Sequence, residues 1–213
     1  MSQIAVLDLG TGNLRSVAKA AEHAAGSRWN VTVTREPSLI EKADRIIVPG
    51  QGAIESWMAA LSNESLRAAV LSGLKNKPVL AICVGMQALF DYDHEHGGHE
   101  CLGLFKGEVV RFEQGKLDEQ GLPMKVPQMG WNQMKKTATH PLWQGIADNS
   151  WFYFLHSYFV STVEKEIIVG ETQYGITYAS AVARDNIFAI QCHPEKSHNA
   201  GIKLIENFVN WRV

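Results

Sequence analysis

The hydrophobic residues in the first half of the chain follow two alternating patterns. Short apolar runs at 3–9, 45–48 and 78–82, together with an alternating segment at 30–36, are typical of strands. Apolar residues at helical spacing follow at 14–25, 54–61 and 64–75, and a further helix is expected to begin at 86–90. Strands that alternate with helices predict right-handed crossovers and a mostly parallel sheet with helices on both faces.

The second half of the chain has a different rhythm. Strand-like segments follow one another with few helices between them, at 104–112, 124–134, 152–160, 166–173, 176–185 and 187–192. The sequence Arg184-Asp185-Asn186 is a turn signal, so hairpins are expected here. An amphipathic helix at 199–211 closes the chain. We expect residues 1–213 to form a single α/β domain, with a mostly parallel central sheet flanked by helices and antiparallel strands added in the second half.

Composition and charge narrow the class of protein. The chain has 213 residues, 46% of them hydrophobic, and a net charge of −2, which gives no electrostatic reason to expect nucleic acid or an anionic membrane as partner. Its first residues do not resemble a signal peptide, and no apolar run approaches the roughly 18 residues of a membrane span. Cys83, Cys101 and Cys192 are too sparse for a disulfide scaffold. We expect a soluble cytoplasmic protein.

Unusual polar residues follow several of the predicted strands. In an open parallel sheet, ligands bind beyond the carboxyl ends of the strands. Five glycine-rich or polar segments stand at such positions, at 8–13, 49–53, 83–85, 156–158 and 193–196. If the strands are as predicted, these segments lie along one edge of the sheet and outline a cleft.

Cys83 stands at the sharpest of these corners. The sequence Ala81-Ile82-Cys83-Val84-Gly85 fits a nucleophile elbow, with alanine in place of the first glycine. Such an elbow needs small neighbours because the nucleophile lies on a strained turn between a strand and a helix. The helix dipole there favours a thiolate over a thiol. The alternative is an inert buried thiol, since free cysteine is among the most buried residue types.

A base and an oxyanion site complete the predicted chemistry. His193 follows an apolar strand and Glu195 lies two residues beyond it, so the carboxylate can orient the imidazole that activates a thiol. The neighbouring Cys192 is expected to point away from the cleft. The backbone N–H groups of Val84 and Gly52 are candidates for stabilising an oxyanion, although 49–53 also fits an ordinary turn.

Segments 49–53, 81–90 and 193–197 together resemble the triad-type, or class I, glutamine amidotransferases. Segments 8–17, 126–132, 154–160 and 192–201 extend the resemblance over essentially the whole chain, and favour the glutaminase subunits of imidazole glycerol phosphate synthases. Ala81 departs from the glycine usual in the superfamily. The resemblance implies a flavodoxin-like sheet and hydrolysis of glutamine through a Cys83 thioester, with His193 as the base and Glu195 orienting it. It implies no cofactor and no metal.

The resemblance also suggests residues that bind the substrate. Gln87 lies one helical turn beyond Cys83 and is expected to face the same pocket. Glu95 is the candidate partner of the substrate's α-ammonium group. Ser157 and Tyr158 are expected to contact the amino-acid end. For each of these residues the alternative is a polar position at the rim.

The family further implies a partner. This is a cyclase subunit, HisF, a (β/α)8 barrel that forms a heterodimer with the glutaminase. It uses the ammonia to make imidazole glycerol phosphate and aminoimidazole carboxamide ribotide for histidine synthesis. Candidate interface residues are Asn13, Trp131, Asn132 and Lys196. Trp is enriched at interface hot spots, and Asn132 could hydrogen-bond across the interface. Lys196 resembles the family's inter-subunit salt-bridge lysine, and Asn13 lies at the same sheet edge. Core packing is the alternative for Trp131, and a solvated charge is the alternative for Lys196. A glycine-rich oxyanion loop also leads us to expect weak hydrolysis without the partner.

Three other functions are weighed against this interpretation. His94, His96, His99 and Cys101 lie close enough in sequence to bind zinc, but their spacing matches no standard motif. A thiol peptidase on a related fold is disfavoured by the His193-Pro194-Glu195 corner. A non-catalytic homologue is disfavoured by the intact Cys83, His193 and Glu195. An amidation pathway other than histidine synthesis stays open.

Overall fold

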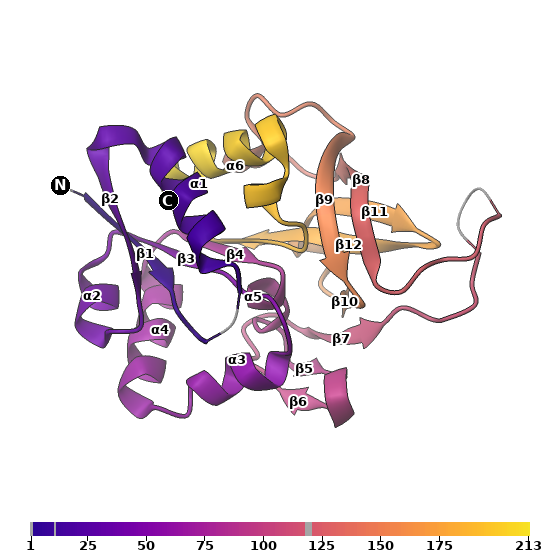
Figure 1. The fold of residues 1–213 in the computed structure, drawn as a ribbon, viewed down its shortest axis with the longest axis horizontal. Coiled ribbons are helices and arrows are strands. Elements are labelled where there is room, and N and C mark those ends of the chain that lie inside the picture. Colours follow the sequence, from indigo (N-terminus) through magenta and orange to yellow (C-terminus); the bar gives the residue numbers. More distant parts are fainter. Residues whose placement is uncertain (1, 11, 118–120) are drawn as a thin grey trace.

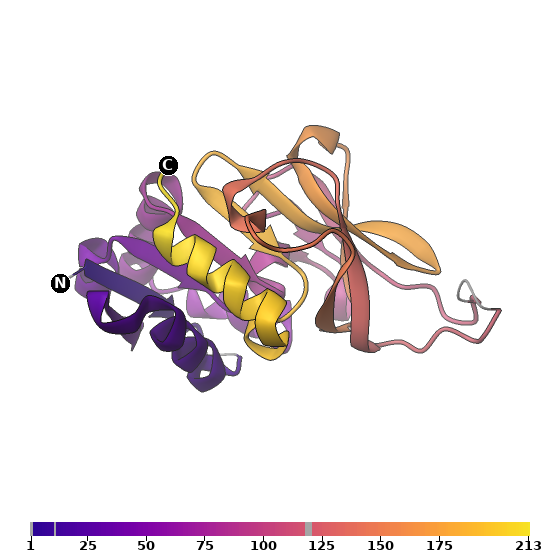
Figure 2. The ribbon, with the colours of Figure 1, turned by 90° about the horizontal axis from the view of Figure 1, so that it is seen from above.

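A large sheet organises the molecule. The computed structural model describes residues 2–10, 12–117 and 121–213. Within these ranges the longest path through the sheet follows the order β2-β1-β3-β4-β13-β12-β10-β7-β5-β6, and β11, β8 and β9 extend it from β12. Figures 1 and 2 show helices packed on the half that contains β1 to β4, while the other half consists mainly of strands.

The first half of the sheet is parallel, as predicted. It contains β1 (Ser2–Leu7), β2 (Trp29–Thr34), β3 (Arg45–Val48), β4 (Val79–Ile82) and β13 (Ile187–Ile190). Every residue of β3, β4 and β13 is buried, because helices cover both faces of these strands. In Figure 1, α1 (Leu14–Ala25) and α6 (His198–Asn210) lie on one face, and α2 (Pro37–Lys42), α3 (Ile54–Ala60) and α4 (Glu64–Asn76) lie on the other.

The second half of the sheet is mainly antiparallel, which confirms the predicted fold class. The central strand is β12 (Ile176–Arg184), which turns into β13 through Asp185 and Asn186 with Arg184 opposite Ile187. Asp185 has a φ of 53°, a left-handed conformation that Asp tolerates in tight turns. The other strands are β5 (Tyr92–Asp93), β6 (His99–Glu100), β7 (Gly107–Arg111), β8 (Gln128–Lys136), β9 (Ser150–His156), β10 (Tyr158–Thr162) and β11 (Ile168–Tyr174).

The helix expected from 86–90 is only one turn long. It is α5 (Val84–Gln87), and the chain leaves it directly afterwards. The carbonyls of Ala88, Leu89 and Phe90 accept hydrogen bonds from the backbone N–H groups of Leu102, Leu104 and Gly103 instead of from a following helical turn. The apolar residues at 88–90 are therefore core residues of an irregular segment, and their helical spacing was misleading.

The segment expected as one strand at 152–160 is two strands. Ser157 separates β9 from β10, and the side chain of His156 bridges the break by donating from Nδ1 to the carbonyl of Tyr158 at 2.8 Å. The sequence prediction also missed α2, β5 and β6. Single turns of 3-10 helix complete the elements at Gly26–Arg28, Glu95–Gly97, Pro141–Trp143, Lys165–Ile167 and Pro194–Lys196. No helix within the described ranges is long and apolar enough to cross a membrane.

The turn after β4 packs directly against the end of β3. A Cβ atom added to Gly85 would lie 2.1 Å from the carbonyl oxygen of Val48, and one added to Gly50 would lie 2.6 Å from the nitrogen of Gly85. Glycine at 85 and 50 therefore lets two backbone segments meet where a larger residue would force them apart.

We expect Gly85→Ala to destabilise the protein by about 3 kcal/mol or more, because the clash is with backbone and cannot be relieved by a rotamer. The matched control is Gly73→Ala in α4, where the clash is with the flexible Cδ1 end of Ile46. That change should alter stability by no more than about 1 kcal/mol, because alanine also favours the helix. Urea unfolding of both variants tests the difference, and equal effects would contradict it.

Candidate active site

The backbone of Cys83 is strained in the way an elbow requires. Its φ is 55° and its ψ is −113°, values that a non-glycine residue rarely adopts. The conformation is held on both sides: the Cys83 N–H donates to the carbonyl of Ile190 at 2.8 Å, and the Cys83 carbonyl accepts from Met86 and Gln87. The surrounding structure thus imposes a conformation that the residue alone would avoid, as is common at functional sites.

His193 and Glu195 form a buried pair on the neighbouring strand. His193 follows β13. Because β13 runs parallel to β4, the two strands end at the same edge of the sheet, and His193 lies beside Cys83. Its Nδ1 lies 2.9 Å from Oε1 of Glu195, and both side chains are almost fully buried. The His193 N–H donates to the carbonyl of Tyr153, and the hydroxyl of Ser197 donates to the His193 carbonyl. The corner that carries the pair is therefore fixed to β9 and to the start of α6.

The charges around His193 favour its protonated form. Burial alone would lower the pKa of His193, but the Cys83 sulfur and the Glu195 carboxylate act against it and raise the pKa to about 10. Nε2 of His193 is buried and has no hydrogen-bond partner among the described residues. The Cys83 sulfur therefore lies close enough to raise the pKa of the ring both by its charge and as a hydrogen-bond acceptor, although no described group meets Nε2 with full hydrogen-bond geometry.

One cavity contains most of the predicted site residues. It has a volume of ≈ 310 Å³ and lies at the carboxyl ends of β3, β4 and β9. Cys83 opens into it, whereas the buried Cys192 is not among its lining residues. The lining residues are Gln51, Gly52, Cys83, Val84, Gln87, Glu95, Leu155, His156, Ser157 and Tyr158.

Two backbone groups beside the sulfur are suited to an oxyanion. Val84 is the first residue of α5, so its N–H has no acceptor within the helix. Gly52 faces the same cavity with a φ of 105°, which glycine adopts without steric cost. The structure thus brings both predicted donors to the cavity that contains Cys83, and their role with an oxyanion remains a prediction.

The polar side chains of the cavity are partly occupied by internal bonds. Oε2 of Glu95 accepts from the N–H of Ile54 at 2.9 Å, which fixes the carboxylate over the start of α3. Gln87 is buried, and its Nε2 donates both to the carbonyl of Tyr158 at 3.0 Å and to Oε1 of Gln191 at 3.1 Å. Gln87 therefore has only its oxygen available for a ligand.

Several residues near the sulfur were not predicted from the sequence. Gln51, Leu155 and His156 line the cavity. Gln191 donates from Nε2 to the sulfur of Cys83 at 3.6 Å. Its position two residues before His193 was the available signal, but contact with Cys83 depends on the register of β13 against β4, which spacing alone does not reveal.

The predicted interface residues lie outside the cavity. Trp131 is 42% exposed on β8, so it is not a core residue, and its ring stacks on His198 at 4.9 Å. Lys196 places its ammonium 5.9 Å from the ring of Tyr153. Asn132 donates to the carbonyl of Gln173, on the face of β8 opposite to Trp131. Asn13 caps α1 by accepting from the N–H of Ser16.

The histidine-rich segment does not gather around a common point. Nε2 of His94 pairs with Glu108 at 2.8 Å, and the sulfur of Cys101 contacts the carbonyl of His99. Within residues 2–10, 12–117 and 121–213, no group of three or more His, Cys, Asp or Glu residues is placed to hold a metal ion.

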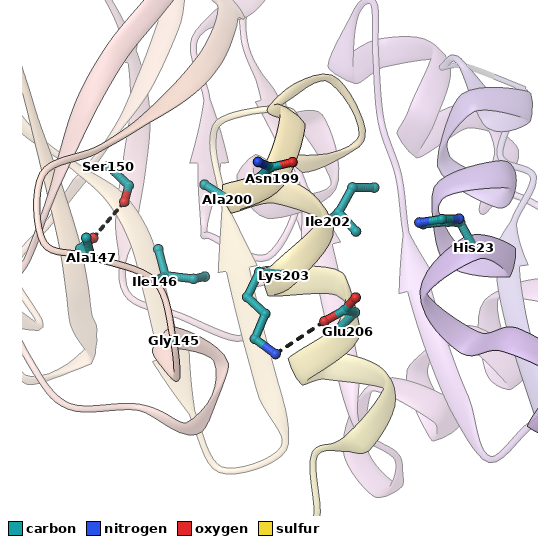
Figure 3. A pocket seen from close by; sticks show the side chains of 10 residues that line it. All are labelled: His23, Gly145, Ile146, Ala147, Ser150, Asn199, Ala200, Ile202, Lys203 and Glu206. Carbon is teal, nitrogen blue, oxygen red and sulfur yellow. Dashed lines mark hydrogen bonds and ion pairs between the residues drawn. The ribbon is translucent and has the colours of Figure 1, made fainter.

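A larger hollow lies elsewhere, along α6, and is lined mainly by that helix and by the segment at 145–150 (Figure 3). It has a volume of ≈ 570 Å³, and Lys203 and Glu206 form an ion pair on one of its walls. His23 faces it from α1. None of Cys83, His193 and Glu195 lines it, so size does not identify the reactive site in this molecule.

Comparison with known proteins agrees with this geometry. Residues 5–211 match the family described as "Glutamine amidotransferase class-I". The chain is 50% identical to "Imidazole glycerol phosphate synthase subunit HisH" of Nitrosomonas europaea, covering 99% of each chain. It is 49% identical to the protein of the same name in Hydrogenovibrio crunogenus, covering 98% of this chain and 96% of that one.

Solved structures show the same fold at low identity. The structure of PurLQS from Thermotoga maritima superposes with a TM-score of 0.73 at 16% identity, covering 98% of each chain. A structure described as glutamine amidotransferase has a TM-score of 0.71 at 14% identity, covering 98% of this chain and 99% of that one.

Asp93, next to the cavity, generates a prediction about stability. It is buried, its Oδ1 accepts from the N–H of Glu95, and its Oδ2 has no partner among the described residues. Burial raises the pKa of Asp93 to about 6, above the unfolded value of about 4. The native state therefore binds more protons in this window, and the Asp93 contribution to stability falls as pH rises from about 4 to about 6.

We expect Asp93→Asn to keep the acceptor for Glu95 and to remove this loss, stabilising the protein by about 1–2 kcal/mol at neutral pH and little at acidic pH. Asp91→Asn is the matched control. The hydrogen bond from Lys106 lowers the pKa of Asp91, so its replacement should destabilise at neutral pH. Denaturant titrations at several pH values measure both, and a destabilising Asp93→Asn at neutral pH would refute the prediction.

Proposed function

The chain belongs to the class-I glutamine amidotransferase family, and on that premise we propose that it is the glutamine-hydrolysing subunit of an imidazole glycerol phosphate synthase. Residues 1–213 act as one glutaminase domain and pass ammonia to a cyclase subunit. The observation that carries the proposal is the buried His193–Glu195 pair beside a strained thiol, at a cavity of amino-acid size. Identity near 50% over the whole length of HisH relatives supports the choice within the family.

The first half of the reaction forms a thioester. The Cys83 thiolate adds to the carboxamide carbon of glutamine, and the carbonyl oxygen becomes an oxyanion that accepts from the N–H groups of Gly52 and Val84. His193, protonated and held by Glu195, gives its Nε2 proton to the departing ammonia. The C–N bond breaks and a γ-glutamyl thioester remains on Cys83. The raised pKa of His193 supports the starting ion pair, since it keeps the imidazolium next to the thiolate.

The second half of the reaction hydrolyses the thioester. His193, now neutral, removes a proton from water at Nε2 while the water oxygen attacks the thioester carbon. The second oxyanion occupies the same site as the first. Its collapse breaks the C–S bond and releases glutamate, with Cys83 again a thiolate and His193 again protonated. The unpartnered Nε2 of His193 supports this role, because it leaves the ring free to exchange protons with ammonia and water.

The substrate's amino-acid end is proposed to lie against Glu95 and the 157–158 segment. One oxygen of Glu95 is held by the N–H of Ile54, so the other is available to the α-ammonium group. The Gln87 oxygen is a second acceptor, because its nitrogen is occupied. Ser157 and Tyr158 line the same cavity.

We propose that the cyclase subunit docks on an apolar face beside the cavity. Alternate residues of the β8–β9 ribbon point outward, and the register places Met129 opposite Leu155 and Trp131 opposite Tyr153. Met129 is 67% exposed, and Leu155 also lines the cavity. The face is therefore continuous with the mouth of the site, where a partner must dock to receive ammonia before it escapes.

The remaining interface residues have separate roles in this proposal. Lys196 lies beside Tyr153 and offers a charge at the edge of the face. Asn13 presents the start of α1 at the same end of the sheet. Asn132 supports Trp131 from the opposite face of β8 by bonding to Gln173. We propose a heterodimer in which a (β/α)8 barrel covers this surface.

Replacing the nucleophile should separate the two activities of the complex. We expect Cys83→Ala to abolish glutamine hydrolysis, because no thioester can form, and to leave synthesis from added ammonium through the cyclase subunit intact. Product formation by the purified complex is measured with each nitrogen source. Loss of both activities in a complex that still assembles would contradict the proposal. If the chain hydrolyses glutamine only in the presence of a synthase subunit from another amidation pathway, it serves that pathway and not histidine synthesis.

Removing the exposed aromatic side chain should weaken docking. The isolated chain is expected to hydrolyse glutamine slowly and to be stimulated by a liganded cyclase subunit. We expect Trp131→Ala to require at least about tenfold more cyclase for half-maximal stimulation, as at an interface hot spot. Val33→Ala, on an equally exposed position of β2, is the control. The prediction fails if Trp131→Ala and Val33→Ala titrate alike, or if hydrolysis is fast without any cyclase.

A further inference from the structure

The sulfur of Cys83 is the end of a buried chain of hydrogen bonds. The carbonyl of Tyr158 accepts from Nε2 of Gln87 at 3.0 Å, Oε1 of Gln191 accepts from the same nitrogen at 3.1 Å, and Nε2 of Gln191 donates to the Cys83 sulfur at 3.6 Å. Gln191 and Gln87 are both buried. The chain connects three strand ends, and Gln191, the residue that reaches the sulfur, has no part in the reaction steps or substrate contacts described above.

The orientation of both amides follows from the carbonyl at which the chain begins. A carbonyl oxygen can only accept, so the group of Gln87 that faces Tyr158 must be its NH2. The second N–H of that group then has Gln191 as its acceptor, which turns the oxygen of Gln191 toward Gln87. The NH2 group of Gln191 is thereby left facing the sulfur. A flip of either amide would place two donors or two acceptors against each other.

The starting carbonyl is itself fixed. It also accepts from Nδ1 of His156 at 2.8 Å, across the break between β9 and β10. The backbone of Gln191 is held by its N–H, which donates to the carbonyl of Ser180 at 2.8 Å. Gln191 is thus held both at its backbone and at its side-chain oxygen, so the side-chain NH2 group is fixed in its orientation toward the Cys83 sulfur.

From this geometry we infer that Gln191 is a positioning residue that directs the Cys83 sulfur and stabilises its thiolate. A thiolate accepts a hydrogen bond more strongly than a thiol, so a donor that is already in place favours the charged form. The effect matters here because Cys83 is nearly fully buried, so few other donors can reach its sulfur. The inference rests on the proposed function for its meaning in catalysis, but the ionisation of the thiol can be measured without it.

The test is the pH dependence of alkylation of Cys83 by iodoacetamide in the full-length chain, located by peptide mass spectrometry. Gln191→Met keeps the volume and removes the donor. We expect it to displace the profile to higher pH and to slow alkylation at neutral pH by about tenfold. Gln191→Glu adds a carboxylate beside the sulfur and should displace the profile further. Gln173→Met, at an exposed position on β11, is the control and should leave the profile unchanged.

The outcomes separate positioning from a structural role. A change in accessibility alone would scale the rate equally at all pH values, so an unmoved profile in both Gln191 variants would overturn the inference. If Gln191→Met does not fold, Gln87→Met serves as the second test of the inference. It removes the hydrogen bond that orients Gln191, so it should move the alkylation profile in the same direction. In the complex, Gln191→Met should lower kcat for glutamine with KM little changed. A moved alkylation profile without any glutaminase activity would leave the inference standing and refute the proposed function.

Discussion

The site depends above all on the parallel pairing of β13 with β4. This pairing sets Ile190 opposite Ile82, and the N–H of Cys83 continues it by donating to the carbonyl of Ile190. Residues 83 and 193, far apart in sequence, therefore emerge at the same edge of the sheet. A slip of one residue would reverse the faces of every side chain on β13 and separate the base from the thiol. Both strands are apolar and buried on both faces, so the hydrophobic pattern does not choose between registers. Backbone bonds at the strand ends hold this one: the N–H of Val79 donates to the carbonyl of Asn186, and the N–H of Cys83 donates to the carbonyl of Ile190.

The strained backbone at Cys83 is held in place by hydrogen bonds and by close packing of the residues around it. Cys83 has an unfavourable backbone conformation, but its N–H and carbonyl are both bonded and Gly85 is pressed against the Val48 carbonyl. The short α5 ends because backbone groups of residues 102–104 take the carbonyls that a longer helix would use. A one-turn helix has only a small dipole, so it contributes less to a thiolate than the sequence pattern suggested. The hydrogen bond from Gln191 and the charge of His193 then become the main local influences on the sulfur.

The sequence predicts those features that depend on neighbouring residues. The alternation of strands and helices, the turn at Asp185 and Asn186, and the local motifs at Cys83 and His193 all follow from short segments. Features that depend on contacts between distant segments were missed. The end of α5 after one turn depends on backbone bonds from residues 102–104, and Gln191 reaches Cys83 only because of strand register. Trp131 could not be assigned to core or surface, because a strand pattern does not say which face of an edge ribbon is covered.

The polar walls of the cavity are partly occupied by internal hydrogen bonds, and the groups left over determine what the site can bind. The nitrogen of Gln87, the carbonyl of Tyr158 and one oxygen of Glu95 are already paired within the protein. Among the groups that remain available on the wall are the other oxygen of Glu95, the oxygen of Gln87 and the N–H groups of Gly52 and Val84, and Nε2 of His193 lies buried behind Cys83. In the proposed reaction they would supply acceptors for an ammonium group, donors for an oxyanion and a proton carrier between them. Leaving Nε2 buried and unbonded costs stability. In the proposed reaction that cost is relieved when ammonia or water exchanges a proton with this atom.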